Sequence, residues 1–231
     1  MPPTILDLFI AAFGQSLLMV GAAGLLAALL GLPLGLLLHA GDRALSNTLS
    51  SGRMFAVVCA ALRSGPVVMA LAIAAPLAQH ALSGEAGLGA AIASLTVIAT
   101  PFLALRVRNA LNAADRRDME TARRQGAAKQ QLLFAAPLPQ AFPAIVRALG
   151  LMLAALVGYS SIAGALLGLG LGDLALRQGY QQFQPMVMLS AAIASVALAE
   201  TAQAMGNLLA ARLQSGPGIA HRPAAHRLPP R

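Results

Sequence analysis

The chain has little charge and few aromatic side chains. Of its 231 residues only 10% are charged, 4% are aromatic and none is tryptophan, whereas 58% are hydrophobic and the mean hydropathy is +0.72. A water-soluble domain of this size needs far more charge on its surface. The composition therefore excludes an ordinary soluble domain and predicts a protein embedded in lipid.

Several residue types with characteristic chemistry are nearly absent. The single cysteine, Cys59, excludes an intramolecular disulfide and is interpreted as a small buried hydrophobe. The single lysine, Lys129, has no glycine-rich phosphate loop around it, so we expect no catalytic residue and no cofactor in this chain. His221 and His226 lie apart and are interpreted as solvated, without a metal site. The net charge of +8 lacks the aromatic-lined basic face of a nucleic-acid binder.

Five apolar stretches are each long enough for a membrane-spanning helix, which needs roughly 20 residues. They run over about residues 13–38, 54–77, 87–105, 143–167 and 185–209. No Lys or Arg precedes the first stretch, and its length exceeds that of a cleaved signal peptide, so we expect it to be retained. The sequence thus predicts an all-α integral membrane protein with five transmembrane helices in one domain, residues 1–214.

Basic residues alternate between the two sides of the predicted spans. The loops after the first and third spans and the chain end carry nearly all of them, whereas the opposite side offers only Arg177, beside Asp7, Glu85 and Asp173. Because cytoplasmic loops carry an excess of Lys and Arg, we expect the N-terminus outside and the C-terminus in the cytoplasm. Residues 215–231, rich in Pro, Gly and Arg, are predicted to form a disordered cytoplasmic tail.

One polar segment, at about residues 112–140, interrupts the apolar chain between the third and fourth spans. Asp115 and Asp118 are typical of a helix start, and Gly126 is typical of a helix end. A second short helix is predicted over about 128–135, where the following prolines end it. Neither piece is long enough to cross a membrane, so we expect a compact polar loop in the cytoplasm. From these features alone, an ordinary solvated loop with an interfacial helix stays equally open.

The polar segment resembles the "EAA" loop of ATP-binding-cassette importer permeases, in which Glu-Ala-Ala is followed by Gly and later by Leu-Pro. The matching positions, with Thr121 in place of the usual alanine, are Glu120, Thr121, Ala122, Gly126, Leu138 and Pro139. The resemblance implies that this loop is a coupling helix docked on a cytoplasmic ATPase, which carries the ATP and Mg²⁺. It also implies a type I importer fold, a second copy of the chain and an extracytoplasmic substrate-binding protein.

The resemblance extends over about residues 14–212. The segment "LRSGPVVMAL" is similar to amino-acid importer permeases, and "SLTVIATPFLALRVRNAL", "LVGYSSIAGALLGLGLG" and "QGYQQFQPMVM" are similar to the methionine importer permeases. It implies ATP-driven import by alternating access, with methionine as the favoured substrate. Another amino acid or an osmoprotectant stays open as an alternative, and so does a non-transport membrane anchor for a cytoplasmic partner.

Ionisable residues inside the predicted spans are few, and the fourth span carries a cluster of hydroxyls. Tyr159, Ser160 and Ser161 stand together in the fourth span, where they either bond a neighbouring helix or, as the resemblance implies, line the translocation path. Arg63 is interpreted as reaching the membrane surface rather than the substrate. Glu200 is costly in lipid, so we expect it to face protein or water, with its role undecided.

Overall fold

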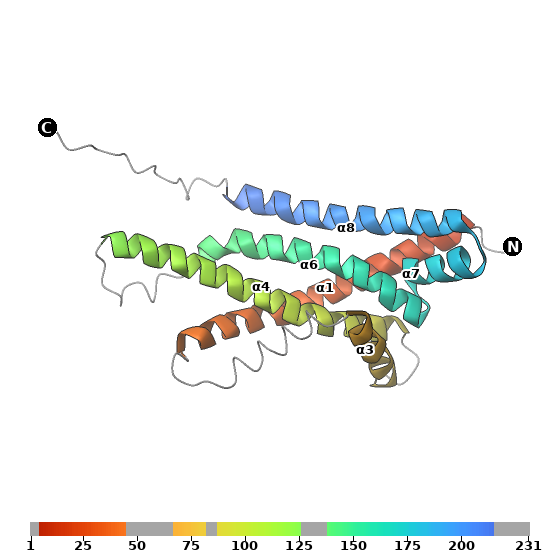
Figure 1. Ribbon diagram of the computed structural model, residues 1–231, viewed down its shortest axis with the longest axis horizontal. Coiled ribbons are helices and arrows are strands. Elements are labelled where there is room, and N and C mark those ends of the chain that lie inside the picture. The colour runs from red at the N-terminus through yellow and green to blue at the C-terminus, as the bar shows by residue number, and fades with distance from the viewer. Residues whose placement is uncertain (1–4, 45–66, 82–86, 126–137, 215–231) are drawn as a thin grey trace.

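The computed structural model of the protein describes residues 5–44, 67–81, 87–125 and 138–214, and these ranges are helical apart from short turns (Figure 1). No strand occurs within them. The elements are α1 (Ile5–Ala44), α3 (Val67–Ala81), α4 (Gly87–Gln125), α6 (Leu138–Leu167), α7 (Gly170–Leu174), the π-helical η1 (Ala175–Gln181) and α8 (Pro185–Gln214).

Among the described helices, α1, α4, α6 and α8 are long and apolar enough to cross a membrane. They contain the first, third, fourth and fifth predicted spans, so the prediction of an all-α membrane protein is confirmed. The second predicted span, 54–77, begins outside the described residues, and α3 contains only its last part. Cys59, Arg63 and the predicted tail 215–231 also lie outside the described residues.

The polar segment does not begin a helix of its own. α4 continues without a break from its apolar part through Asp115 to Gln125, so the separate helix start predicted at Asp115 is wrong. Leu111 and Ala114, just before it, are only 1% and 6% exposed and pack in the main core. Since neither glycine nor proline interrupts this stretch, helix propensity and packing together favour continuation. The expected compact loop is thus corrected for its first part, and 128–135 lies outside the described residues.

The end of the polar segment also differs from the prediction. Pro139, expected to end a short helix, lies instead in the first turn of α6, and Pro143 lies inside the same helix. Proline is tolerated in a first turn because the amide that it lacks would have no partner within the helix there. The fourth membrane helix therefore begins several residues before the predicted boundary.

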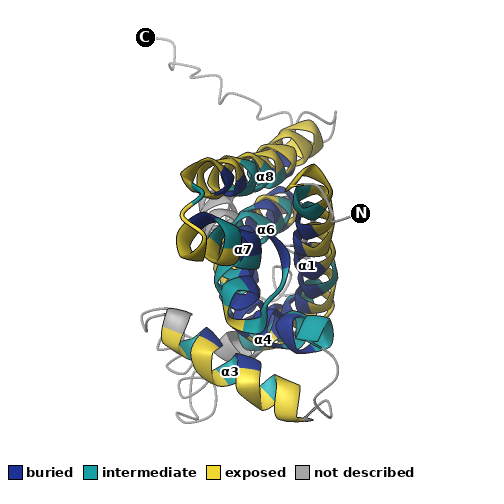
Figure 2. Ribbon diagram, turned by 90° about the vertical axis from the view of Figure 1, so that its right-hand side faces the viewer, coloured by how far each residue is buried: buried dark blue, intermediate teal, exposed yellow. Residues whose placement is uncertain are grey.

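The main core lies where α1, α4 and α6 meet, and Figure 2 shows their buried faces turned toward one another. Its fully buried large side chains include Met19, Leu71, Leu95, Leu103 and Leu156. A smaller core joins α1, α7 and α8 through Ala12, Leu171, Leu174, Val187 and Ala191. The short helix α7 is therefore held between the first and last membrane helices.

Glycines let two helix pairs come into backbone contact. On α6 and α8, a Cβ added to Gly150 would lie 2.7 Å from Gly206 Cα. On α1 and α4, a Cβ added to Gly35 would lie 2.8 Å from the Ala104 carbonyl oxygen, and one added to Gly31 would lie 3.1 Å from the Thr100 carbonyl oxygen. Such close crossings are a main source of helix association in lipid, where apolar side chains gain little by leaving the surrounding tails.

Replacing Gly150 with alanine is expected to push α6 and α8 apart and to destabilise the protein by about 1–3 kcal/mol, as overpacking does in tight cores. Thermal unfolding of the detergent-solubilised protein measures this as a lower midpoint temperature. Gly158→Ala is the matched control on the same helix, because its Cβ would have nothing within 4 Å. Equal midpoints for the two variants would contradict the close crossing.

Candidate functional site

The residues of the predicted coupling pattern gather at one end of the bundle. Glu120, Thr121 and Ala122 lie near the end of α4, and Leu138 and Pro139 lie in the first turn of α6. Figure 1 shows that the end of α4 projects beyond the other helices, and we call residues 115–125 the α4 tip. Gly126 lies outside the described residues. The two ends of the pattern therefore lie at the same end of the molecule.

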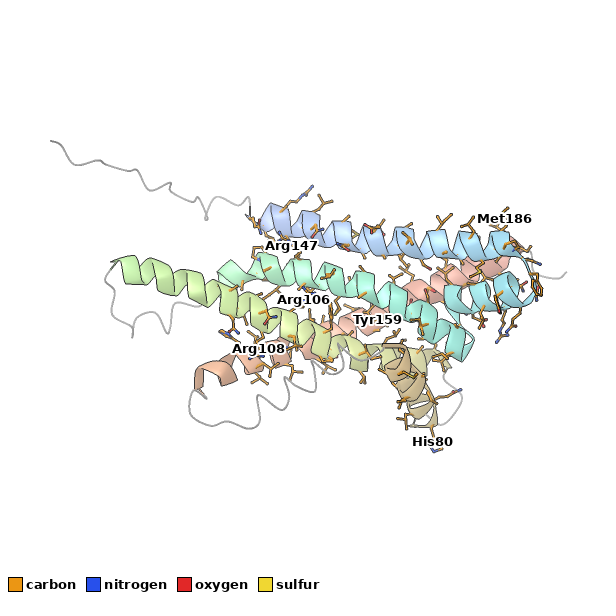
Figure 3. The ribbon with its side chains drawn as sticks, viewed as in Figure 1. His80, Arg106, Arg108, Arg147, Tyr159 and Met186 are labelled. Carbon is orange, nitrogen blue, oxygen red and sulfur yellow. The ribbon has the colours of Figure 1, made fainter. Side chains whose placement is uncertain are left out.

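Four arginines of the described helices lie toward the same end. Figure 3 shows Arg106, Arg108 and Arg147 in the half of the bundle nearer the α4 tip, and Arg212 lies in the last turn of α8. The Arg106 guanidinium lies 5.2 Å from the centroid of the Phe102 ring, a distance suited to a cation–π contact. The two ends of the bundle thus differ in charge.

The opposite end carries a glycine-rich turn that folds back onto α6. Gly168 and Gly170 have φ values of 75° and 65°, in the left-handed region that favours glycine. A Cβ on Gly172 would overlap the Ser161 carbonyl oxygen, and one on Gly164 would overlap the Leu169 carbonyl oxygen. The turn and α7 therefore lie directly against the backbone of the predicted hydroxyl cluster.

The predicted hydroxyl cluster uses its serine side chains within α6 itself. The buried Ser160 hydroxyl donates to the Val157 carbonyl oxygen at 2.8 Å, and the Ser161 hydroxyl donates to the same oxygen at 3.3 Å. Tyr159 is partly buried and packs against the main core. These bonds hold the serine hydroxyls to their own helix in this conformation. That the three residues line a translocation path stays a prediction.

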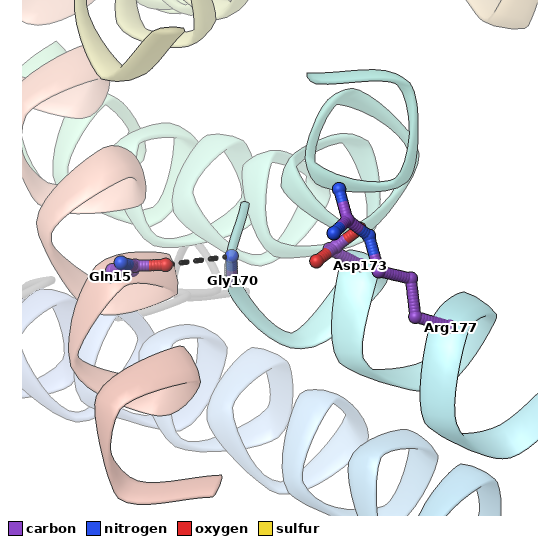
Figure 4. A network of polar contacts seen from close by, with 4 residues as sticks. All are labelled: Gln15, Gly170, Asp173 and Arg177. Atoms are coloured by element: carbon purple, nitrogen blue, oxygen red, sulfur yellow. Dashed lines mark hydrogen bonds and ion pairs between the residues drawn. The ribbon is translucent and has the colours of Figure 1, made fainter. Parts of the chain in front are cut away.

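Two polar side chains of α1 hold the glycine-rich turn. Gln15 Oε1 accepts a hydrogen bond from the Gly170 amide at 3.0 Å (Figure 4). Ser16 Oγ accepts one from the Leu171 amide at 2.9 Å. These are the first amides of α7, which have no partner within the helix. The sequence analysis did not single out this pair, although a Gln-Ser dipeptide in an apolar span is itself a signal.

An ion pair connects α7 to the element that follows it, η1. Arg177 Nε lies 2.7 Å from Asp173 Oδ1, which links α7 to η1 one helical turn further on (Figure 4). The Arg177 side chain is 63% exposed, so the pair lies near the protein surface and contributes little stability. Arg177, the basic residue that the sequence analysis placed on the side opposite the basic loops, is thus paired with a carboxylate.

Helix α1 also has a polar contact with α4, near the α4 tip. The Nδ1 atom of His39 lies 2.6 Å from Asn112 Oδ1, and since an amide oxygen only accepts, the ring nitrogen donates. His39 is 6% exposed. The sequence analysis missed this contact as well, and its signal would have been a histidine near the end of a strongly apolar helix.

Comparison with known proteins identifies the family. Residues 31–215 match the family described as "Binding-protein-dependent transport system inner membrane component". The chain belongs to this family. With its apolar helices it is therefore a multi-pass membrane protein of the inner-membrane permease type.

Similar sequences carry a more specific name. The chain is 32% identical to the "Probable D-methionine transport system permease protein MetI" of Vibrio cholerae, over 90% of this chain and 92% of that protein. It is 33% identical to the protein of the same name from Pasteurella multocida, over 92% of this chain and 98% of that one. The resemblance to methionine importer permeases seen in the sequence is thereby confirmed.

Solved structures agree with these matches. A chain of the inward-facing "MetNI methionine ABC transporter" superposes with a TM-score of 0.78 at 29% identity, over 92% of this chain and 99% of that one. A chain of "an amino acid ABC transporter with histidines" superposes with a TM-score of 0.68 at 18% identity, over 92% of this chain and 100% of that one, which shows the fold alone. The type I importer permease fold is confirmed.

Replacing Gly172 with alanine is expected to loosen the turn, because the new Cβ would overlap the Ser161 carbonyl oxygen. Tryptic cleavage after the exposed Arg177 should then become several-fold faster, since cleavage requires local opening. Gly87→Ala is the control, because its Cβ would make an ordinary 3.6 Å contact with Leu169 Cδ1. Unchanged cleavage after Arg177 in the Gly172 variant would disprove the tight packing of α7.

Proposed function

We propose that this chain is the permease subunit of an ATP-driven importer that moves methionine across the bacterial inner membrane by alternating access. One observation carries the proposal: the likeness in sequence and fold to proteins named as methionine permeases covers about nine tenths of the chain. Because this likeness extends over the whole helical bundle, it favours transport over a membrane anchor. The similar sequences reported above are named as methionine permeases, which favours methionine over another amino acid or an osmoprotectant.

The proposed energy source is a separate ATPase chain that binds ATP and Mg²⁺. The similar MetNI structure is that of an ABC transporter, and this chain has a single lysine without a phosphate loop. The α4 tip projects from the bundle and carries Glu120, Thr121 and Ala122, so a soluble partner can reach it (Figure 1). Gly126, Leu138 and Pro139 complete the proposed docking pattern.

The proposed orientation places the α4 tip in the cytoplasm and the N-terminus outside. The arginines that lie toward the α4 tip support this orientation, because basic residues favour the cytoplasmic side. The α7 turn then faces the outside, where the proposed substrate-binding protein delivers methionine. The ATPase and the binding protein consequently act at opposite ends of the bundle.

The exposed surface of α8 supports a second copy of the chain. Within the chain, 50% of the most apolar part of α4 is buried, but only 11% of that of α8. Glu200 is exposed near the middle of α8, where facing lipid would be costly for its carboxylate. Two copies around one aqueous path, each contacting one ATPase, would give Glu200 protein or water as its neighbour. The predicted path residues Tyr159, Ser160 and Ser161 lie on α6, the helix that packs against α8.

In the proposed cycle, ATP binding brings the two ATPases together and moves the two α4 tips toward each other. The membrane helices then open outward and accept methionine, and hydrolysis restores the inward-facing state. The similar MetNI structure is in an inward-facing state, which is one of the two states that this cycle requires. No chemical step occurs on the permease chain in this proposal.

Replacing Glu120 with alanine is expected to lower ATP-driven uptake at least tenfold, while the ATPase still hydrolyses ATP and the permease reaches the membrane at a normal level. The reason is loss of a docking contact on the α4 tip rather than loss of the fold. Uptake of labelled methionine and phosphate release in vesicles with the whole complex measure both quantities. Asp118→Ala, in the same tip but outside the pattern, is the control. Normal uptake by the Glu120 variant would refute the docking role.

Competition for uptake tests the substrate. In the same vesicles, excess unlabelled methionine should abolish uptake of the label, whereas most other amino acids and an osmoprotectant such as glycine betaine should leave it nearly unchanged. Equal or stronger competition by another solute would assign the permease to that solute instead.

A further inference from the structure

Helix α1 has polar attachments at both ends of the bundle. Near the α4 tip, His39 contacts Asn112 of α4, and at the opposite end, Gln15 and Ser16 hold the first amides of α7. We propose that α1 and α4 move as one rigid pair, which transmits displacement of the α4 tip to the α7 turn at the other end. This inference rests on the proposed function, because it assumes that an ATPase displaces the tip.

The first link is the continuity of α4. The helix runs without a break from Gly87 to Gln125, so the α4 tip and the membrane-spanning part are one element. Between Asn112 and the tip the chain has neither glycine nor proline, the usual causes of a sharp bend. Force on the tip therefore displaces the body of α4 rather than bending a loop.

The second link is the seam between α4 and α1. Gly31, Gly35 and His39 follow one another at intervals of about one turn along α1, so they lie on one face. The two glycines lie against the Thr100 and Ala104 carbonyl oxygens, and His39 follows at 2.6 Å from Asn112. Sliding would require bulkier neighbouring side chains to enter a backbone contact and the partly buried hydrogen bond between His39 and Asn112 to break. Both changes are costly in a low-dielectric interior, so the two helices should shift together.

The third link is α1 itself and its contact with α7. Pro33 lies inside α1, and the contacts of Gly31 and Gly35 with the α4 backbone on either side of it hold this part of the helix against α4. From His39 to Gln15 the helix spans about 36 Å at about 1.5 Å per residue, somewhat more than the roughly 30 Å thickness of a bilayer's apolar core. At its other end Gln15 and Ser16 bond the Gly170 and Leu171 amides, and Ser16 Oγ would be only 2.5 Å from a Cβ on Gly170. A shift of α1 therefore has to displace the turn, or else leave amides of α7 without a partner.

The turn connects the pair to the rest of the bundle. Gly172 of α7 lies against the Ser161 carbonyl oxygen of α6, and Leu171 and Leu174 pack with Val187 and Ala191 of α8. Displacing α7 thus acts on α6, which carries the predicted path residues, and on α8, whose exposed surface the proposed function assigns to the pairing of two copies. His39, Asn112, Gln15 and Ser16 are positioning residues in this scheme, since none of them needs to touch the substrate.

Hydrogen exchange in the assembled complex tests the inference. In the wild-type complex, adding a non-hydrolysable ATP analogue should change the exchange rate of the amides of residues 170–174 at least threefold. Asn112→Leu removes the acceptor of the His39 bond and should reduce this nucleotide response at least threefold, although the amides lie at the other end of the bundle. Asn112→Asp keeps an acceptor oxygen at Oδ1 and should retain the response.

A second variant acts at the opposite end. Gln15→Leu combined with Ser16→Ala removes both acceptors and should abolish the response of the turn, while a Gln15→Glu variant keeps the Oε1 acceptor and should preserve it. Because the two attachments are far apart, a folding defect in one variant leaves the other as an independent test. Thermal unfolding of each complex identifies such a defect.

The outcomes separate this inference from the proposed function. A full nucleotide response in either Asn112→Leu or the Gln15/Ser16 double variant would overturn the rigid pair, and so would a wild-type complex that imports methionine without any exchange change at residues 170–174. A wild-type complex that shows the exchange response but imports no methionine would leave the rigid pair standing and refute the proposed substrate.

Discussion

Backbone contact between helices in lipid is the constraint on which this structure depends. Apolar side chains gain little by leaving lipid tails, so the bundle needs close approach and internal hydrogen bonds to associate specifically. Gly150 and Gly206 provide the approach between α6 and α8, and Gly31 and Gly35 provide it between α1 and α4. The same constraint explains why the glycines at these crossings cannot be exchanged for larger residues without displacing a helix.

Because α4 is continuous, the first part of the polar segment and a membrane-spanning helix are one rigid element. An isolated loop could dock on a partner without moving anything else, whereas a helix that extends from the core into water carries its displacement into the bundle. The cost of such a design is that polar residues must continue a helix whose preceding turns are buried. Leu111 and Ala114 meet this requirement by packing in the core immediately before the polar residues begin.

The two ends of the bundle differ in a way that suits proteins acting from opposite sides. One end has a projecting helix with arginines behind it, and the other has a glycine-rich turn held by hydrogen bonds from α1. Between them, α8 exposes apolar side chains and Glu200, a combination that neither water nor lipid alone satisfies. The proposed pairing of two copies would resolve this conflict, because each copy would cover part of the other.

The sequence by itself determined that this protein is embedded in lipid, where most of its membrane helices lie, and which segment resembles the coupling loop of importer permeases. These features are local, since hydropathy over some twenty residues is enough to select a membrane span. Tertiary structure alone decided whether Asp115 begins a helix, because the capping signal there is weaker than the packing of Leu111 and Ala114 just before it. It also decided which polar side chains meet. His39 and Asn112 are 73 positions apart and Ser16 and Leu171 are 155 apart, so only the folding of the whole bundle brings these pairs within hydrogen-bonding distance.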